Sequence, residues 1–222
     1  MRRDRLPLWL TALALSACAD EAAKDPRPEQ PDIAAEDTAT AEEALPRDGF
    51  DRSKAGVERE ELVEAPFGTV RITELAMDGP HSASGRLDVM YLDAAGVAVD
   101  EYPGAVVMGS WGRMSDWSIR RDFGDYPVVV AQGGWTGQGQ VCNWTSLTEL
   151  RPDGPVELLS FMDYASNDNK GREVDEVTGE MADPQQDGTL TVSYTGTRNF
   201  TSTYRRTGNA YERVSGEELE GC

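Results

Sequence analysis

The sequence has few of the residues on which catalytic sites most often depend. It contains one histidine, three cysteines and three lysines among 222 residues. A Ser-His-Asp or Cys-His site would have to use His81, which lies in the turn-like segment "DGPHSASG" without a G-x-S-x-G motif around it. We therefore interpret His81 as a solvent-exposed turn residue and predict no catalytic residue and no cofactor.

Motifs for metals and nucleotides are also missing. One histidine with two distant cysteines does not give the ligand spacing of a structural zinc site. The acidic segment "NDNKGREVDE", residues 167–176, does not fit the twelve-residue calcium loop. The glycines of "QGGWTGQGQ", residues 132–140, are not followed by the Lys-Ser/Thr pair of a phosphate loop. We expect no metal site.

Positive charge is scarce. The chain has 21 Lys and Arg against 40 Asp and Glu, which gives a formal net charge of −19. A chain this acidic repels phosphate backbones and anionic lipid head groups. This charge argues against a nucleic-acid partner and against direct docking of the folded part on a membrane surface.

A short apolar segment lies near the N-terminal end. Residues 6–17 are mostly apolar, but twelve residues are too few to cross a bilayer. Three arginines precede the segment, which is the layout of a secretory signal. Its end, Leu15-Ser16-Ala17-Cys18, resembles the lipobox of bacterial lipoprotein precursors. An ordinary signal peptide with an incidental cysteine is the alternative.

The lipobox resemblance, which covers only residues 1–18, implies a lipid anchor. It implies cleavage before Cys18, acyl chains such as palmitate on that residue, and attachment to the membrane of a bacterial cell envelope. In enteric-type lipoproteins an aspartate directly after the cysteine retains the protein in the inner membrane. Ala19 holds that position here, which favours the periplasmic face of an outer membrane where one exists. Cleavage would bring the net charge to −21, because it removes three arginines and one aspartate.

Residues 18–48 are expected to form a solvated acidic tether. Ten of the thirty residues after Cys18 are acidic and four are prolines, and only Ile33 and Leu45 are sizeable apolar residues. Such a segment has too little apolar surface to offset the entropy of ordering.

Residues 49–222 are predicted to form one all-β domain. After a possible short helix over 57–64, segments such as "GTVRITEL" and "GRLDVMYLD" alternate apolar and polar residues and are separated by Gly, Asp and Pro. We expect an antiparallel meander of about nine or ten strands, arranged as a sandwich, a barrel or a propeller-like fold.

The C-terminal half contains two similar segments, residues 127–160 and 189–215. Asn143 and Asn199 align at an offset of 56. We interpret the segments as a repeated three-strand unit, with chance similarity as the alternative. The first copy carries an eight-residue insertion, "WTGQGQVC" (residues 135–142), where the second has only two residues between Gly196 and Asn199. We expect the insertion to form a loop. Because loops on a rigid frame often carry binding sites, this loop is a candidate for the function of the domain.

Tryptophans and cysteines supply the remaining candidates. Four tryptophans within 34 residues could form a stacking platform for sugar rings, although tryptophan at strand positions is more often core packing: Trp111, Trp117, Trp135 and Trp144. The first three are the candidate binding residues. If lipid occupies Cys18 in an oxidising compartment, Cys142 and Cys222 are the two remaining thiols. We predict that they form a disulfide. The alternative is a buried thiol at Cys142 and intermolecular pairing through Cys222.

Two functional hypotheses follow. The first is a lipid-anchored, non-catalytic β domain that binds a protein or cell-wall glycan in the envelope. The second is a secreted glycan hydrolase that uses a carboxylate pair such as Asp122 and Asp125. A clustered pair of buried acids in an open groove would favour the hydrolase, and a flat loop that carries tryptophan would favour the binding protein.

Overall fold

The structure, a computed structural model, describes residues 49–168 and 175–221. Cys18, the tether and Cys222 lie outside the described residues. The described chain consists of twelve strands and one 3-10 turn, η1 (Arg52–Lys54). The strands are β1 (Gly56–Ala65), β2 (Gly68–Ala76), β3 (Gly85–Leu92), β4 (Ala98–Met108), β5 (Asp116–Arg120), β6 (Val128–Gly137), β7 (Gln140–Arg151), β8 (Gly154–Asn167), β9 (Asp175–Met181), β10 (Thr189–Gly196), β11 (Phe200–Thr207) and β12 (Ala210–Ser215).

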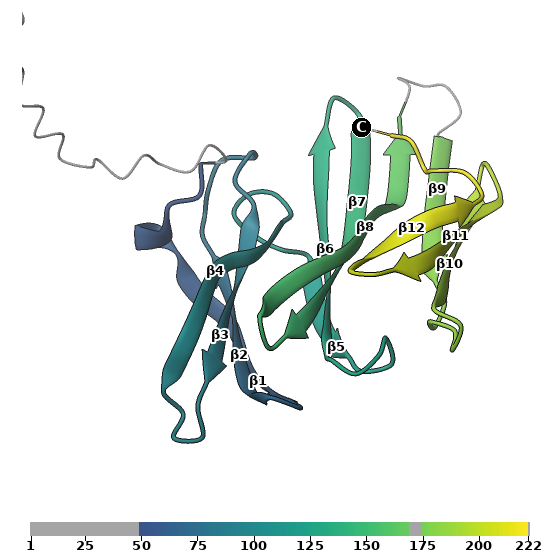
Figure 1. The fold of residues 1–222 in the computed structure, drawn as a ribbon. Coiled ribbons are helices and arrows are strands. Elements are labelled where there is room, and N and C mark those ends of the chain that lie inside the picture. Colours follow the sequence, from purple (N-terminus) through teal and green to yellow (C-terminus); the bar gives the residue numbers. More distant parts are fainter. Residues whose placement is uncertain (1–48, 169–174, 222) are drawn as a thin grey trace, which may run out of the picture. The chain divides into compact units, whose positions relative to one another are not determined.

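The strands form two antiparallel sheets (Figure 1). The four-stranded sheet has the order β1-β2-β3-β4, and the eight-stranded sheet has the order β12-β11-β10-β9-β8-β7-β6-β5. Each sheet is a meander in which every strand pairs with its neighbours in sequence, and neither is closed into a barrel. The predicted all-β antiparallel meander is therefore confirmed, with twelve strands in place of nine or ten.

The prediction of a short helix over residues 57–64 is wrong. This segment belongs to β1, which pairs with β2 through Val63 opposite Val70 and Ala65 opposite Gly68. Val63 and Val70 are both buried. The four glutamates of the segment favour a helix by intrinsic propensity, but propensity is a weak preference that tertiary packing overrides. Pairing with the apolar face of β2 decides the conformation here.

Two further differences concern β4 and β9. The sequence pattern predicts two separate strands, "VAVDEY" (residues 97–102) and "AVVMGSW" (residues 105–111). In the structure one strand, β4, continues through a bulge where Gly104 has a φ of +66°. Strand β9 was not predicted, because its acidic sequence buries only Val177. Its Gly179 lies under the ring of Tyr194, where an added Cβ would come within 2.6 Å of the ring.

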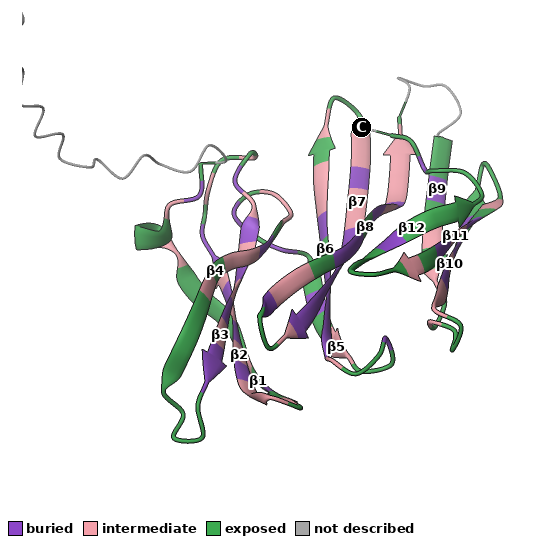
Figure 2. Cartoon of the chain, viewed as in Figure 1, coloured by how far each residue is buried: buried purple, intermediate pink, exposed green. Residues whose placement is uncertain are grey.

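Strand β6 contributes to two hydrophobic cores. Val128 and Val130 pack in a core built from β6–β12, with partners such as Leu147. Val129 and Ala131 point the other way and join a core that includes residues of the four-stranded sheet. Figure 2 shows the buried segments of β6, β7 and β8 in purple. Burial on both faces explains why this strand is an uninterrupted apolar run.

The two similar segments both fold as three-strand meanders, β6–β8 and β10–β12. In each, an asparagine lies beside the aligned glycine of the preceding strand. A Cβ added at Gly134 would lie 1.8 Å from Oδ1 of Asn143. Oδ1 of Asn199 accepts a hydrogen bond from the backbone N–H of Gly196 at 3.3 Å. These shared contacts fit the interpretation as a repeat.

The expected loop at residues 135–142 is a longer hairpin. Strands β6 and β7 continue to pair, with Trp135 opposite Cys142 and Gly137 opposite Gln140. Gln138 and Gly139 form the connection, with φ angles of +54° and +82°. Two positive φ angles are typical of a type I′ turn, which suits the twist of paired strands. The insertion thus extends the sheet and carries Trp135 along the extension.

Candidate functional site

Three aromatic side chains from separate segments meet at the surface. Trp111 lies between β4 and β5, His81 lies between β2 and β3, and Trp135 lies on β6. The imidazole centroid is 4.9 Å from the Trp111 ring, edge to face, and 5.5 Å from the Trp135 ring. We call these three residues the aromatic cluster. It brings together two of the three predicted tryptophans, and Trp111 is 55% exposed.

A tight turn displays Trp111. The backbone N–H of Arg113 donates to the carbonyl of Ser110 at 3.1 Å, and the central residues Trp111 and Gly112 have φ angles of +59° and +75°. Glycine and asparagine suit this type I′ geometry, whereas a bulky residue at positive φ is strained by about 1–2 kcal/mol. The chain therefore holds a large apolar side chain, mostly in solvent, at a backbone position that disfavours it.

Hydrogen bonds fix this turn to the segment that carries His81. The N–H of Gly112 donates to the carbonyl of Ala83 at 2.7 Å, and the N–H of Met77 donates to the carbonyl of Gly112 at 3.0 Å. Ala83 in turn donates to the carbonyl of Pro80 at 2.9 Å, which closes the turn around His81. The backbones of Trp111 and His81 are thus held in a fixed relation.

The third member of the cluster is fixed by close backbone packing. Gly133 on β6 lies against the backbone of Gly109, where an added Cβ would approach the Gly109 nitrogen to 2.3 Å. Two residues further along β6, the indole of Trp135 lies over Gly137, with ring atoms 2.5 Å from the position of an added Cβ. Glycine at positions 133 and 137 is therefore needed to seat the turn and the indole.

His81 is not the solvent-exposed turn residue that the sequence suggested. It is half-buried, and its Nε2 atom is buried without a hydrogen-bond partner among the described residues. A buried polar atom without a partner costs free energy. The imidazole thus lies between the two indoles, and its unpaired Nε2 atom lowers the stability of the fold.

Trp117 does not belong to the cluster, which corrects its place among the predicted binding residues. It is 2% exposed and packs in the core shared with the four-stranded sheet. Its Nε1–H donates to Oε2 of Glu74 at 2.8 Å, and the guanidinium of Arg59 lies 4.0 Å from the ring centroid. Trp117 is therefore a packing residue.

A sequence feature that points to the same region was not among the predictions. No charged residue occurs from residue 126 to residue 148, although 27% of the chain is charged. This stretch covers almost all of the β6–β7 hairpin, and its polar side chains include amides such as Gln138 and Gln140. The uncharged hairpin carries Trp135 and adjoins the other two aromatic residues.

Asp122, one member of the carboxylate pair suggested for a glycan hydrolase, is bound by a cation of the chain itself. Two hydrogen bonds from Arg120 to Asp122 hold the pKa of Asp122 below its usual value, which makes this residue a poor proton donor. Asp122 is exposed, whereas three acids among the described residues are buried and accept hydrogen bonds within the chain, although Oδ1 of Asp163 is left without a partner. Glu149 binds Arg151 and Arg206, Glu74 binds Trp117, and Asp163 binds Thr145 and Gln132.

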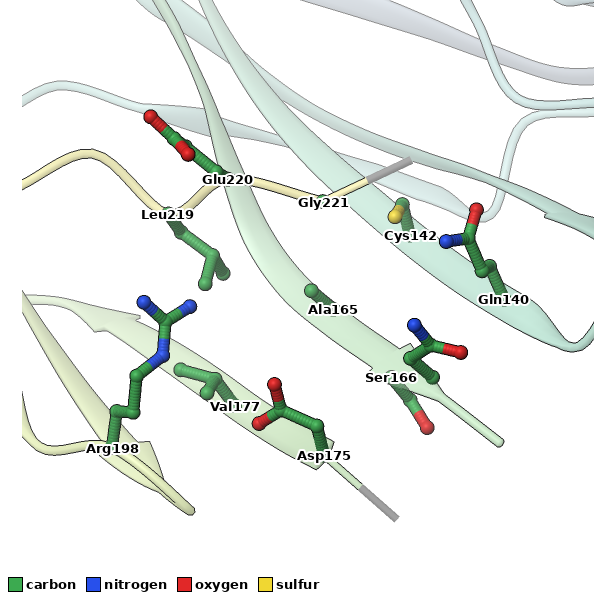
Figure 3. A pocket seen from close by; sticks show the side chains of 11 residues that line it. Gln140, Cys142, Ala165, Ser166, Asp175, Val177, Arg198, Leu219, Glu220 and Gly221 are labelled. Atoms are coloured by element: carbon green, nitrogen blue, oxygen red, sulfur yellow. The ribbon is translucent and has the colours of Figure 1, made fainter. Parts of the chain in front are cut away.

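A small pocket of about 80 Å³ lies beside Cys142 (Figure 3). It has room for a few water molecules, at about 30 Å³ each. Gln140 and Cys142 lie on one side of it and Arg198 on the other. Gly221 also lines the pocket, and a Cβ added there would lie 3.1 Å from Sγ of Cys142. Gly221, the residue before Cys222, therefore lies close to Cys142, and the disulfide stays a prediction.

Residues 49–168 and 175–221 contain no group of three or more His, Cys, Asp or Glu side chains that could hold a metal ion. In the same residues no helix is long and apolar enough to cross a membrane. Comparison of the chain with family profiles, with curated proteins and with solved structures found no match.

Proposed function

We propose that this chain is a lipid-anchored protein of the bacterial cell envelope whose β domain binds an envelope protein or a cell-wall glycan through the aromatic cluster. The observation that carries the proposal is the conformation of Trp111. An exposed indole at a strained backbone position lowers stability, and such strain persists at sites where it serves a function. The lost stability is compensated if the indole contacts a ligand.

The acidic residues support a binding role over hydrolysis. Among the described residues, Glu149 and Glu74 are bound by donors of the chain itself, Asp163 is bound through Oδ2 alone, and Asp122 is held as an anion by Arg120. A glycosidase needs one carboxyl group with a raised pKa to protonate the leaving group. The aromatic cluster needs no proton transfer to bind a ligand.

The binding role can be tested by site-specific cross-linking in the native host. A photoreactive amino acid at Ser82, an exposed neighbour of His81, should form covalent adducts with the partner on irradiation. Combining this change with Trp111→Gly should abolish the adducts. The same amino acid at Val214, which is 52% exposed on β12, serves as the control and should form none. Absence of adducts at Ser82, or adducts that persist with Trp111→Gly, would contradict the proposal.

The anchoring role makes a separate prediction about Cys18. Replacing Cys18 with Ser should abolish incorporation of labelled palmitate and leave the precursor uncleaved, because the lipobox resemblance makes this thiol the acceptor of the lipid. Membrane fractionation and mass spectrometry measure both effects. Cys222→Ser is the matched control and should keep full labelling. A Cys18→Ser protein of mature size in the membrane fraction would show that Cys18 is not the anchor.

A further inference from the structure

The surroundings of the aromatic cluster are unusually poor in charge. The β6–β7 hairpin is uncharged from residue 126 to residue 148. Arg113, the cation next to the Trp111 turn, is already bound by two carboxylates, Glu58 at 3.3 Å and Asp78 at 3.2 Å. The chain as a whole has a net charge of −19. An anionic ligand would therefore meet repulsion from the acidic chain, and Arg113, the basic side chain of the Trp111 turn, is already bound by carboxylates.

Polar groups that can bind a ligand lie beside the indole of Trp135. Gln140 is directly opposite Gly137 in the hairpin, so its side chain is on the same face as Trp135, whose ring covers Gly137. The amides of Gln138 and Gln140 form no hydrogen bond with another described residue. Each amide offers two donors and an acceptor, a combination that suits hydroxyl groups.

The apolar part of the site is limited to the aromatic rings. The segments that build the cluster, residues 77–84, 109–115 and 133–143, contribute no exposed large apolar side chain other than Trp111. A protein interface usually has a contiguous apolar centre. Here the exposed indole of Trp111 and the half-buried indole of Trp135 lie beside the uncharged amides of the β6–β7 hairpin.

We infer that the aromatic cluster binds a neutral glycan, with the C–H faces of its pyranose rings stacked on Trp111 and Trp135 and its hydroxyl groups bound by Gln140. The inference rests on the proposed function and names the ligand class of the same site. A pyranose combines an apolar face of axial C–H groups with a rim of uncharged hydroxyls, which matches the two kinds of group on the protein. An uncharged ligand also avoids repulsion by the acidic chain.

Binding is tested with the full chain and defined tetrasaccharides. Chitotetraose, cellotetraose and maltotetraose are neutral, whereas a hyaluronan tetrasaccharide is anionic. Tryptophan fluorescence and saturation-transfer NMR should show saturable binding of at least one neutral probe and none of the anionic probe. Trp111→Gly and Trp135→Ala should each weaken binding by about 30-fold or more, and Gln140→Ala by about fivefold. Val99→Ala, at a residue 59% exposed on β4, is the control and should leave affinity unchanged.

Two outcomes would overturn the inference. One is that no neutral probe binds at concentrations up to about 10 mM, and the other is that the hyaluronan tetrasaccharide binds equally well. If cross-links from Ser82 nevertheless capture a protein partner and depend on Trp111, the proposed function stands and only the glycan assignment fails. If the cross-links are absent as well, both fail.

Discussion

Replacing Trp117 with Ala is expected to lower the free energy of unfolding by about 3–5 kcal/mol, the cost of removing a large aromatic side chain from a core. The side chain is 2% exposed, and its removal leaves the carboxylate of Glu74, itself 9% exposed, without its hydrogen-bond donor. An unpaired buried carboxylate adds a desolvation cost to the cavity. Urea unfolding followed by circular dichroism measures the loss.

Trp111→Gly is the matched control, because it removes the same side chain from a strained and exposed position. Glycine relieves the backbone strain at a φ of +59°, so the free energy of unfolding should stay the same or rise by about 1 kcal/mol. A loss similar to that of Trp117→Ala would make Trp111 a packing residue. The aromatic cluster would then no longer be a candidate binding site.

Breaking the predicted Cys142–Cys222 disulfide is expected to have the second large effect on the free energy of unfolding. Cys222→Ser is expected to lower the free energy of unfolding by about 4 kcal/mol, because the bond would close a long loop and so restrict the unfolded chain. Gly221, the residue before Cys222, lines the same pocket as Cys142. Urea unfolding of the wild type with and without a reducing agent should give the same difference.

Counting thiols gives an independent check of the bond. The unreduced mature protein should show no reactive thiol when unfolded, because lipid occupies Cys18 and the disulfide occupies the other two cysteines. Unfolded and alkylated Cys222→Ser protein should show one, at Cys142. Two reactive thiols per unfolded wild-type chain would rule the disulfide out.

Local sequence patterns predicted the strands where local and tertiary preferences agree. The run from Val128 to Ala131 predicted a strand, and the structure shows why it is apolar on both faces, since the two faces belong to different cores. Strand β1 was missed because its glutamates favour a helix, whereas its pairing with β2 depends on the partner strand. A conformation that is imposed by a neighbouring strand cannot be predicted from the sequence of the segment alone.

The candidate site depends still more on contacts between distant parts of the sequence. Nothing local distinguishes Trp111 from Trp117, since both occur in short polar segments six residues apart. Their environments differ only because Trp111 lies in a type I′ turn at the surface, whereas Trp117 packs in a hydrophobic core. The position of His81 between two indoles likewise requires three segments to be placed together. The type I′ hairpin at Gln138-Gly139, in contrast, has a glycine signal that could have been recognised.

The acidity of β1 bears on self-association. This strand is at the edge of the four-stranded sheet and pairs only with β2 among the described residues, which leaves one row of backbone donors and acceptors open to another chain. Its single cation, Arg59, is engaged by Glu61 and Trp117 of its own chain. Copies anchored on one membrane, as proposed, would meet at high local density. Pairing of two such edges would bring glutamates opposite glutamates, so like-charge repulsion keeps crowded neighbours from joining into a continuous sheet.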